Sequence, residues 1–113
     1  MPAKSNIPAA EALELTALIS YTEQGISSRV IAQAGGGNVT LFAFDEGQEL
    51  SEHASPYEAL VDVIEGTLMI TVGGTTVRAT SGTVVRIPSN VPHSLESPRR
   101  SKMVLVMLRG RGT

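Results

Sequence analysis

The chain has 113 residues, of which 42% are hydrophobic and 18% charged, and its formal net charge at pH 7 is -2. This length fits one compact domain and is too short for two ordinary ones, and the composition is that of a globular protein rather than a disordered one. The chain contains no cysteine, which excludes disulfides, zinc–thiolate sites and cysteine nucleophiles.

Charge and hydropathy patterning exclude two classes of partner. The basic residues are too scattered to form a phosphate-binding surface, so we expect no nucleic-acid partner. No apolar run approaches the roughly 20 residues of a membrane span, and Glu11 and Glu14 interrupt the N-terminal segment where a signal peptide would be apolar. We therefore expect a cytoplasmic protein with no membrane partner.

The beginning of the chain is the one place where a helix is expected. Residues 1–24 are predicted to form an N-terminal arm with a first strand or turn, and residues 1–8, which include Pro2 and Pro8, are predicted to be loose. Residues 9–19 have the propensity of a short helix or of a helical turn that leads into a strand. Periodicity does not separate these two alternatives at this length.

From residue 25 onward, short runs rich in β-branched residues alternate with turn formers. Such spacing, without helical patterns between the runs, is typical of an antiparallel sandwich or barrel. We predict an all-β fold in which residues 25–110 form a single barrel and residues 111–113 a tail. The runs predicted as strands are 26–34, 38–44, 59–66, 67–73, 75–80, 83–88 and 102–108.

Glycines mark the turns between these runs. Glu65-Gly66 and Gly73-Gly74 are predicted as two-residue hairpin turns, because glycine adopts positive φ at little cost. Thr80, Ser81 and Gly82 are predicted to form a further turn.

The last run, residues 103–108, is apolar at every position and therefore on both faces of a strand. Such a strand is either buried between two sheets or covered by a partner subunit. Because an uncovered strand of this kind would promote aggregation, we expect a homodimer.

Two groups of residues, which together include both histidines of the chain, keep a characteristic spacing. The groups are Gly47, His53, Ser55, Ala59 and Gly66, and Gly82, Pro88, Asn90, His93 and Ser97. Their spacing matches the two motifs of the cupins, and the chain resembles that family of small barrels over residues 47–97. The resemblance implies a jelly-roll barrel of the RmlC-like type, also called a double-stranded β-helix.

The resemblance also implies a metal site that this chain carries only in part. In metal-binding cupins the positions that correspond to 53, 55, 59 and 93 supply three imidazoles and one carboxylate, a set that suits Fe, Mn, Ni, Cu or Zn. Here Ser55 and Ala59 replace one imidazole and the carboxylate, so that His53 and His93 remain. Alanine cannot coordinate a metal, and a neutral hydroxyl is a poor ligand.

Other groups near these positions are alternative ligands. Glu58 is adjacent to the carboxylate position, but strand alternation directs it to the opposite face unless a bulge intervenes, and Gln48 or water are further candidates. A methionine facing the interior would suit Cu(I) together with two imidazoles. We expect instead that Met69, Met103 and Met107 fill gaps in a core that is poor in aromatic residues.

Two functions from different classes follow. In the first, the barrel binds a small molecule or a weakly held metal ion through His53 and His93, with Ser55, Tyr57 and Ala59 lining the site. In the second, the protein is a metal-dependent enzyme of the dioxygenase or isomerase type, with Glu58, Gln48 or water completing the coordination. A metal-free version would use one histidine as a general base. We favour the binding function, because the scaffold is complete while half of the ligand set is missing, and no catalytic residue is predicted.

Overall fold

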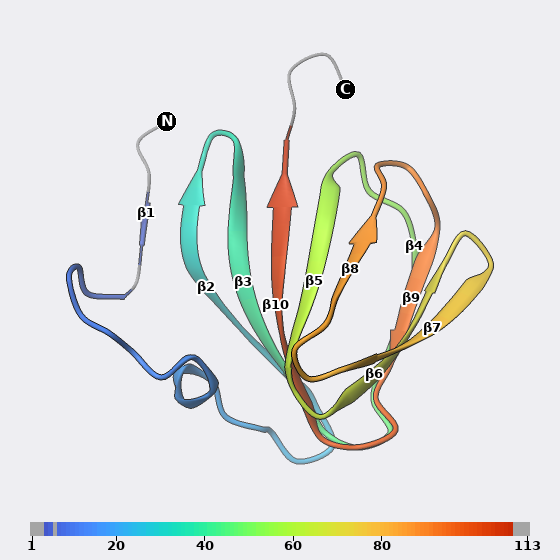
Figure 1. The fold of residues 1–113 in the computed structure, drawn as a ribbon, viewed down its shortest axis with the longest axis horizontal. Coiled ribbons are helices and arrows are strands. Elements are labelled where there is room, and N and C mark those ends of the chain that lie inside the picture. The colour runs from blue at the N-terminus through green and yellow to red at the C-terminus, as the bar shows by residue number, and fades with distance from the viewer. Residues whose placement is uncertain (1–3, 6, 110–113) are drawn as a thin grey trace.

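The computed structural model describes residues 4–5 and 7–109, which form two antiparallel β-sheets (Figure 1). The large sheet has the strand order β1-β2-β3-β10-β5-β8, and the small sheet has the order β4-β9-β6-β7. This arrangement confirms the predicted all-β jelly roll. The strands are β1 (Lys4–Ser5), β2 (Ile26–Ala34), β3 (Gly37–Phe44), β4 (Glu49–His53), β5 (Glu58–Glu65), β6 (Thr67–Val72), β7 (Thr75–Thr80), β8 (Val84–Ile87), β9 (His93–Glu96) and β10 (Ser101–Leu108).

All seven runs predicted as strands are strands, but three further strands were not among them. β1 falls in the arm that was expected to be loose, and it pairs with residues 32–33 of β2. β4 and β9 have the sequences ELSEH and HSLE, in which polar and charged residues outnumber apolar ones. These two strands carry the histidines.

One of the two predicted hairpin turns is correct and the other is wrong. Gly73 and Gly74 have φ of 56° and 87° and join β6 to its neighbour β7, where Val72 pairs with Thr75. Glu65-Gly66, by contrast, does not join paired strands, because β5 lies in the large sheet and β6 in the small one. Both edges of β5 are already occupied by β10 and β8, so the chain crosses to the other sheet at Gly66.

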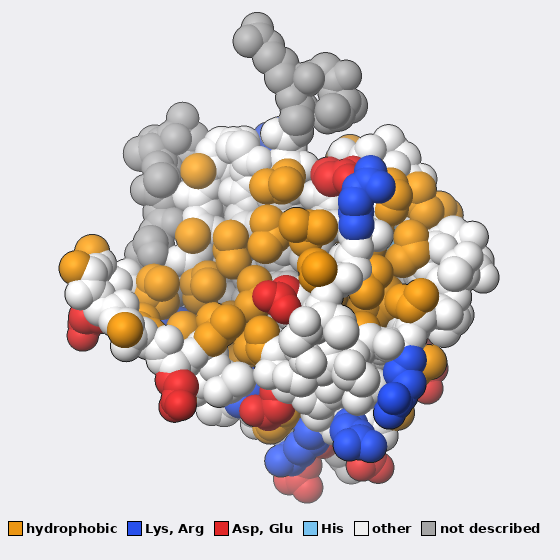
Figure 2. All heavy atoms as spheres, in the orientation of Figure 1, with side chains coloured by type: hydrophobic (Ala, Val, Ile, Leu, Met, Phe, Trp, Pro, Cys, Tyr) orange, Lys and Arg blue, Asp and Glu red, His pale blue; other side chains and the backbone are white. Residues whose placement is uncertain are grey.

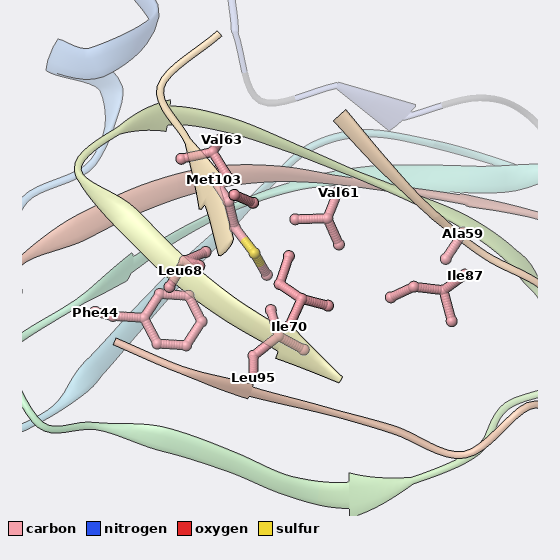
Figure 3. Close-up of a cluster of buried hydrophobic side chains, with 10 residues drawn as sticks. Phe44, Ala59, Val61, Val63, Leu68, Ile70, Ile87, Leu95 and Met103 are labelled. Carbon is pink, nitrogen blue, oxygen red and sulfur yellow. The ribbon is translucent and has the colours of Figure 1, made fainter. Parts of the chain in front are cut away.

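The hydrophobic core lies between the two sheets (Figure 3). Leu68 and Ile70 of the small sheet are fully buried against Val61, Val63 and other side chains of the large sheet. Aliphatic residues, Phe44 and Met103 fill this space, as expected for a chain without tryptophan. The buried members of the cluster are Phe44, Ala59, Val61, Val63, Leu68, Ile70, Ala79, Ile87, Leu95 and Met103.

The N-terminal segment packs on the outer face of the large sheet. Of the two alternatives for residues 9–19, the helical turn is formed, as a single 3-10 turn, η1 (Leu15–Leu18). Next to it, Ile19 is buried together with Leu41 of β3 and Val104 of β10. Lys102 Nζ donates a hydrogen bond of 2.7 Å to the Thr16 carbonyl, which fastens the segment to the sheet. Within the described part of the chain, no helix is long and apolar enough to cross a membrane.

Candidate functional site

The two histidines face each other across the pair formed by β4 and β9. His53 is the last residue of β4 and His93 the first of β9, and the two are direct partners in the antiparallel register. Their ring centroids are 4.3 Å apart, and the ring planes are inclined by 60°. Positions far apart in the sequence therefore contribute to one imidazole pair.

A β-bulge in β4 brings His53 to this position. Leu50 pairs with Leu95 and His53 with His93, so three steps along β4 correspond to two steps along β9. In a regular strand, Leu50 and His53 would lie on opposite faces. The extra residue turns His53 toward the face on which Leu50 packs against the core, which is a typical use of a bulge beside a functional site.

Both imidazoles are held in the same tautomer. The Nδ1 of His53 lies 2.8 Å from the Ser51 carbonyl oxygen, and the Nδ1 of His93 lies 2.9 Å from the Val91 carbonyl oxygen. Because a carbonyl oxygen only accepts hydrogen bonds, each Nδ1 carries the proton and donates it. In the neutral ring, Nε2 then has a lone pair that can accept a hydrogen bond or bind a metal ion.

This pair lies at one end of the barrel, which we call the mouth. The backbone amide of Asn90 donates a hydrogen bond of 2.7 Å to the Ser55 carbonyl. This bond joins the loop that leaves β4 to the loop that enters β9. Ala59 of β5 lies at the same end, opposite Ile87 at the end of β8. At the mouth His93 is only 7% exposed, whereas His53 is exposed to solvent. One imidazole is thus shielded and the other accessible.

The other two positions of the implied four-ligand set have structural roles. Ala59 is 4% exposed and belongs to the hydrophobic core. Ser55 is half-buried, and its Oγ lies 3.3 Å from the Tyr57 amide, from which it accepts a hydrogen bond. Ser55 therefore shapes the loop that leaves β4, and Ala59 forms part of the core at the mouth end of β5.

The alternative ligands are directed elsewhere. Glu58 forms an ion pair with Arg86 and accepts a hydrogen bond of 3.3 Å from the Ser89 amide. Gln48 precedes the other end of β4, far from the imidazoles, where its backbone amide donates to Ser97 Oγ and its backbone carbonyl accepts from the Ser97 amide. Among the described residues, no group of three or more His, Cys, Asp or Glu side chains is placed to hold a metal ion. The described residues therefore do not fit a four-ligand metal centre.

The methionines considered as soft ligands occupy three different places. Met103 is 1% exposed and is part of the core, as the packing interpretation predicts. Met69 lies on β6 in a hollow together with Glu49 and Glu96, on the small sheet. Met107 pairs with Ala59, which brings it to the end of the barrel where the imidazoles lie.

Tyr57 lies at the rim of the mouth and contacts a residue that the sequence reasoning did not include. The guanidinium carbon of Arg109 is 5.1 Å from the centroid of the Tyr57 ring, and the Arg109 Nη2 donates to the Tyr57 hydroxyl. The Arg109 amide also donates a hydrogen bond of 2.7 Å to the Gly36 carbonyl, so its backbone is fixed. This contact follows from the antiparallel register of β10 and β5. Leu108 pairs with Glu58, so the next residue, Arg109, lies beside the preceding residue, Tyr57.

Comparisons with known proteins agree with this architecture. The family described as Cupin domain matches residues 40–109. A conserved protein of unknown function from Streptococcus pyogenes has 30% identity over 99% of this chain and 98% of its own, with a TM-score of 0.91. A cupin superfamily protein from Desulfitobacterium hafniense has 25% identity over 94% of this chain and 97% of its own, with a TM-score of 0.88.

A more distant relative shares the fold alone. An RmlC-like cupin from Shewanella frigidimarina has 20% identity over 99% of this chain and 97% of its own, with a TM-score of 0.79. Among curated proteins, no significant match is found.

Proposed function

The chain belongs to the cupin domain family, and from this premise we propose that it is a binding protein whose mouth holds a small molecule or a weakly bound metal ion through His53 and His93. Fold membership does not determine the function, because one barrel hosts many chemistries. The proposal therefore depends on the imidazole pair itself.

The observation that carries the proposal is the matched hydrogen bonding of the two rings, which among the described residues leaves Nε2 of each as the free nitrogen. Each Nδ1 is engaged with a backbone carbonyl two residues earlier, at 2.8 Å for His53 and 2.9 Å for His93. Neither Nε2 has a hydrogen-bond partner among the described residues. Two adjacent, oriented nitrogen donors are suited to share one ligand, either a metal ion or a polar group of a small molecule.

The surroundings support weak rather than tight metal binding. Two imidazoles are half of the usual donor set, and the neighbouring Ala59 side chain offers no donor. The buried position of His93 favours a ligand that also contacts apolar surface. At the rim, the Arg109 guanidinium adds a positive charge, which favours a carboxylate on an organic ligand.

Imidazole nitrogen resonances provide the direct test. Metal-stripped protein is titrated with Zn(II), Ni(II) and, separately, benzoate, while the ring ¹⁵N signals of both histidines are followed by NMR. We expect at least one probe to shift the Nε2 signals of both rings at concentrations between about 1 µM and 1 mM. The double variant H53A/H93A, which has no imidazole signals and is therefore compared with the unchanged protein by calorimetry, should bind that probe at least about tenfold more weakly, a loss of about 1.4 kcal/mol.

Glu52→Gln is the matched control, because Glu52 is exposed and directly precedes His53 but is not part of the imidazole pair. It should bind each probe like the unchanged protein. If no probe moves the ring signals, or if the double variant binds as strongly as the unchanged protein, the histidine pair is not the binding site.

A further inference from the structure

Arg109 and Tyr57 form an oriented polar pair at the mouth, which we call the Arg–Tyr pair. The guanidinium carbon of Arg109 lies 5.1 Å from the centroid of the Tyr57 ring, and its Nη2 donates to the Tyr57 hydroxyl. Arg109 has no ion-pair partner among the described residues, and Glu58, the carboxylate next to Tyr57 in the sequence, is paired with Arg86. The fold therefore holds a positive charge in a fixed orientation without a described counter-ion.

Strand alternation places the Arg–Tyr pair on the inner face of the large sheet. The core side chains of β10 and β5 stand at odd positions, which are Met103 and Leu105 in β10 and Ala59, Val61 and Val63 in β5. Tyr57 and Arg109 lie one residue beyond the paired ends of these strands and continue the odd positions. The Arg109 amide donates to the Gly36 carbonyl at 2.7 Å, so the ladder between β10 and β3 extends to Arg109.

The imidazole pair lies on the inner face of the small sheet at the same end of the barrel. His93 is two residues from the core residue Leu95 in β9, and the bulge in β4 gives His53 the same orientation. Ser55, two residues after His53, accepts a hydrogen bond from the Tyr57 amide at its Oγ, which connects the two pairs through one loop. Packed sheets lie about 10 Å apart, so one small molecule can contact both pairs at once.

The polar atoms left on the two pairs define the chemistry of a ligand. The hydroxyl proton of Tyr57 and further N–H groups of Arg109 have no acceptor among the described residues, and a carboxylate accepts from both. Because each Nδ1 carries the proton, each Nε2 accepts a hydrogen bond, which a hydroxyl group of the ligand donates. Val72, the register partner of His93, and Leu105 add partly buried apolar surface on the inner faces.

We propose that the Arg–Tyr pair determines the ligand class of the mouth and selects a small organic acid that carries a hydroxyl group. The carboxylate binds to Arg109 and Tyr57, and the hydroxyl donates to an Nε2 of the imidazole pair. This inference rests on the proposed binding function and adds the class of ligand to it. The Tyr57 ring holds the guanidinium in one orientation, so that less conformational entropy is lost on binding.

The outer face of the same sheet has a different character. Figure 2 shows hydrophobic side chains gathered over β2, β3 and β10, with charged side chains mostly around the margins of this area. Such a surface does not suit a charged ligand. The inner face at the mouth, with its oriented guanidinium, is therefore the side of the large sheet that suits a carboxylate.

Hydroxybenzoates and their amides test this selection, because the three ring isomers hold the two polar groups at three fixed separations. Calorimetry of the metal-stripped protein compares 2-, 3- and 4-hydroxybenzoate with the corresponding hydroxybenzamides, in which a neutral carboxamide replaces the carboxylate. We expect at least one isomer to bind at least about tenfold more tightly as the acid than as the amide. Arg109→Gln should abolish this ratio by weakening only the acid, whereas H53A/H93A should weaken the acid and the amide alike.

Two further variants separate position from charge. Arg78→Gln is the matched control, because it removes the same charge from an exposed residue on β7 of the small sheet, and it should keep the ratio of the unchanged protein. Tyr57→Phe keeps the ring against the guanidinium but removes the hydroxyl, and should lower the ratio about threefold. Arg109 is exposed, so its variant is expected to fold.

Equal binding of acids and amides, an unchanged ratio in Arg109→Gln, or no binding of any hydroxybenzoate overturns the role of Arg109. An unchanged ratio in Tyr57→Phe overturns the role of the Tyr57 hydroxyl. If Zn(II) or Ni(II) still shifts the Nε2 signals of both rings in the same protein, the proposed binding function stands although the ligand class is wrong. The two failures are therefore distinguishable.

Discussion

The end of the barrel opposite the mouth, which we call the closed end, differs from the mouth in how its polar side chains are used. At the closed end, the hydroxyls of Ser97 and Ser101 are fully buried and donate to backbone carbonyls. At the mouth, the exposed His53 and the buried His93 each keep one nitrogen without a partner among the described residues. Ser97 Oγ donates to the Asp45 carbonyl at 2.6 Å, and Ser101 Oγ donates to the Thr67 carbonyl at 2.8 Å. At the closed end, polar side chains are therefore used to hold loops and strands together.

Under the binding proposal, this difference separates the residues that stabilise the barrel from those that would bind a ligand. The strands converge at the closed end (Figure 1), where a change in one side chain disturbs several connections at once. Among the described residues, each ring at the mouth is held by one hydrogen bond to a backbone carbonyl in its own strand or loop. Substitutions should therefore affect the free energy of unfolding strongly at the closed end and weakly at the mouth.

Gly66→Ala should have the largest effect. Gly66 has a φ of 79°, and a Cβ at this position would lie 2.3 Å from the Arg100 carbonyl oxygen and 2.4 Å from Ser101 Oγ. The backbone at Arg100 would have to move to make room for this Cβ, and alanine at position 66 would also be strained at positive φ. We therefore expect a loss of at least about 3 kcal/mol in the free energy of unfolding. Urea denaturation followed by circular dichroism measures this loss.

Gly82→Ala is the matched control for backbone strain alone. Gly82 has a similar φ of 91°, but nothing lies within 4 Å of the Cβ that would be added. We expect a loss of only about 1–2 kcal/mol. Equal losses at the two positions would show that the close approach at Gly66 is not what makes this crossing sensitive.

Asp45→Asn should have a smaller effect that depends on pH. The pKa of Asp45 is lowered from 3.8 to about 2, and the largest cause is the hydrogen bond from the Arg100 side chain. Hydrogen bonds from the backbone amides of Gln24 and Glu46 lower this pKa further. A lowered carboxyl pKa contributes stability that is present above the unfolded-state value and is lost as the pH falls through the folded-state value. The wild-type advantage over Asp45→Asn should therefore be constant above about pH 5 and be lost progressively between about pH 5 and pH 1.

Urea midpoints of both proteins across this pH range measure the advantage. The two curves should meet at about pH 1, below the folded-state pKa of Asp45. A difference that stays constant down to that pH would contradict a role for the ionised Asp45 in holding Arg100 and the loop at the closed end.

The sequence predicted the closed end better than the mouth. Glycine tolerates positive φ, and Gly47, Gly66 and Gly82 all have it, at 81°, 79° and 91°. Long apolar runs likewise marked the strands that form the core. The nature of the Gly66 crossing was missed, because a turn sequence does not tell whether the next strand pairs with the previous one or passes to the other sheet.

At the mouth, the identity of the imidazole pair was predictable from motif spacing, but its geometry was not. β4 and β9 are short and polar, so hydrophobic periodicity does not reveal them. The bulge that turns His53 toward His93 leaves no pattern in the residues ELSEH. The Arg109 contact with Tyr57 depends on the register of β10 against β5, which only the assembled sheet determines.

His53→Ala should have the smallest effect on stability, and this prediction tests the mouth most sharply. The ring is exposed and makes one hydrogen bond, to the Ser51 carbonyl, so the free energy of unfolding should change by no more than about 0.5 kcal/mol. His93→Ala removes a ring that is only 7% exposed and should cost about 1–2 kcal/mol. If the binding proposal is correct, both variants lose a similar share of probe affinity despite this difference in stability, because each supplies one of two donors to the same ligand. A His53 variant that is destabilised as strongly as Gly66→Ala would instead place this residue among the structural groups of the barrel.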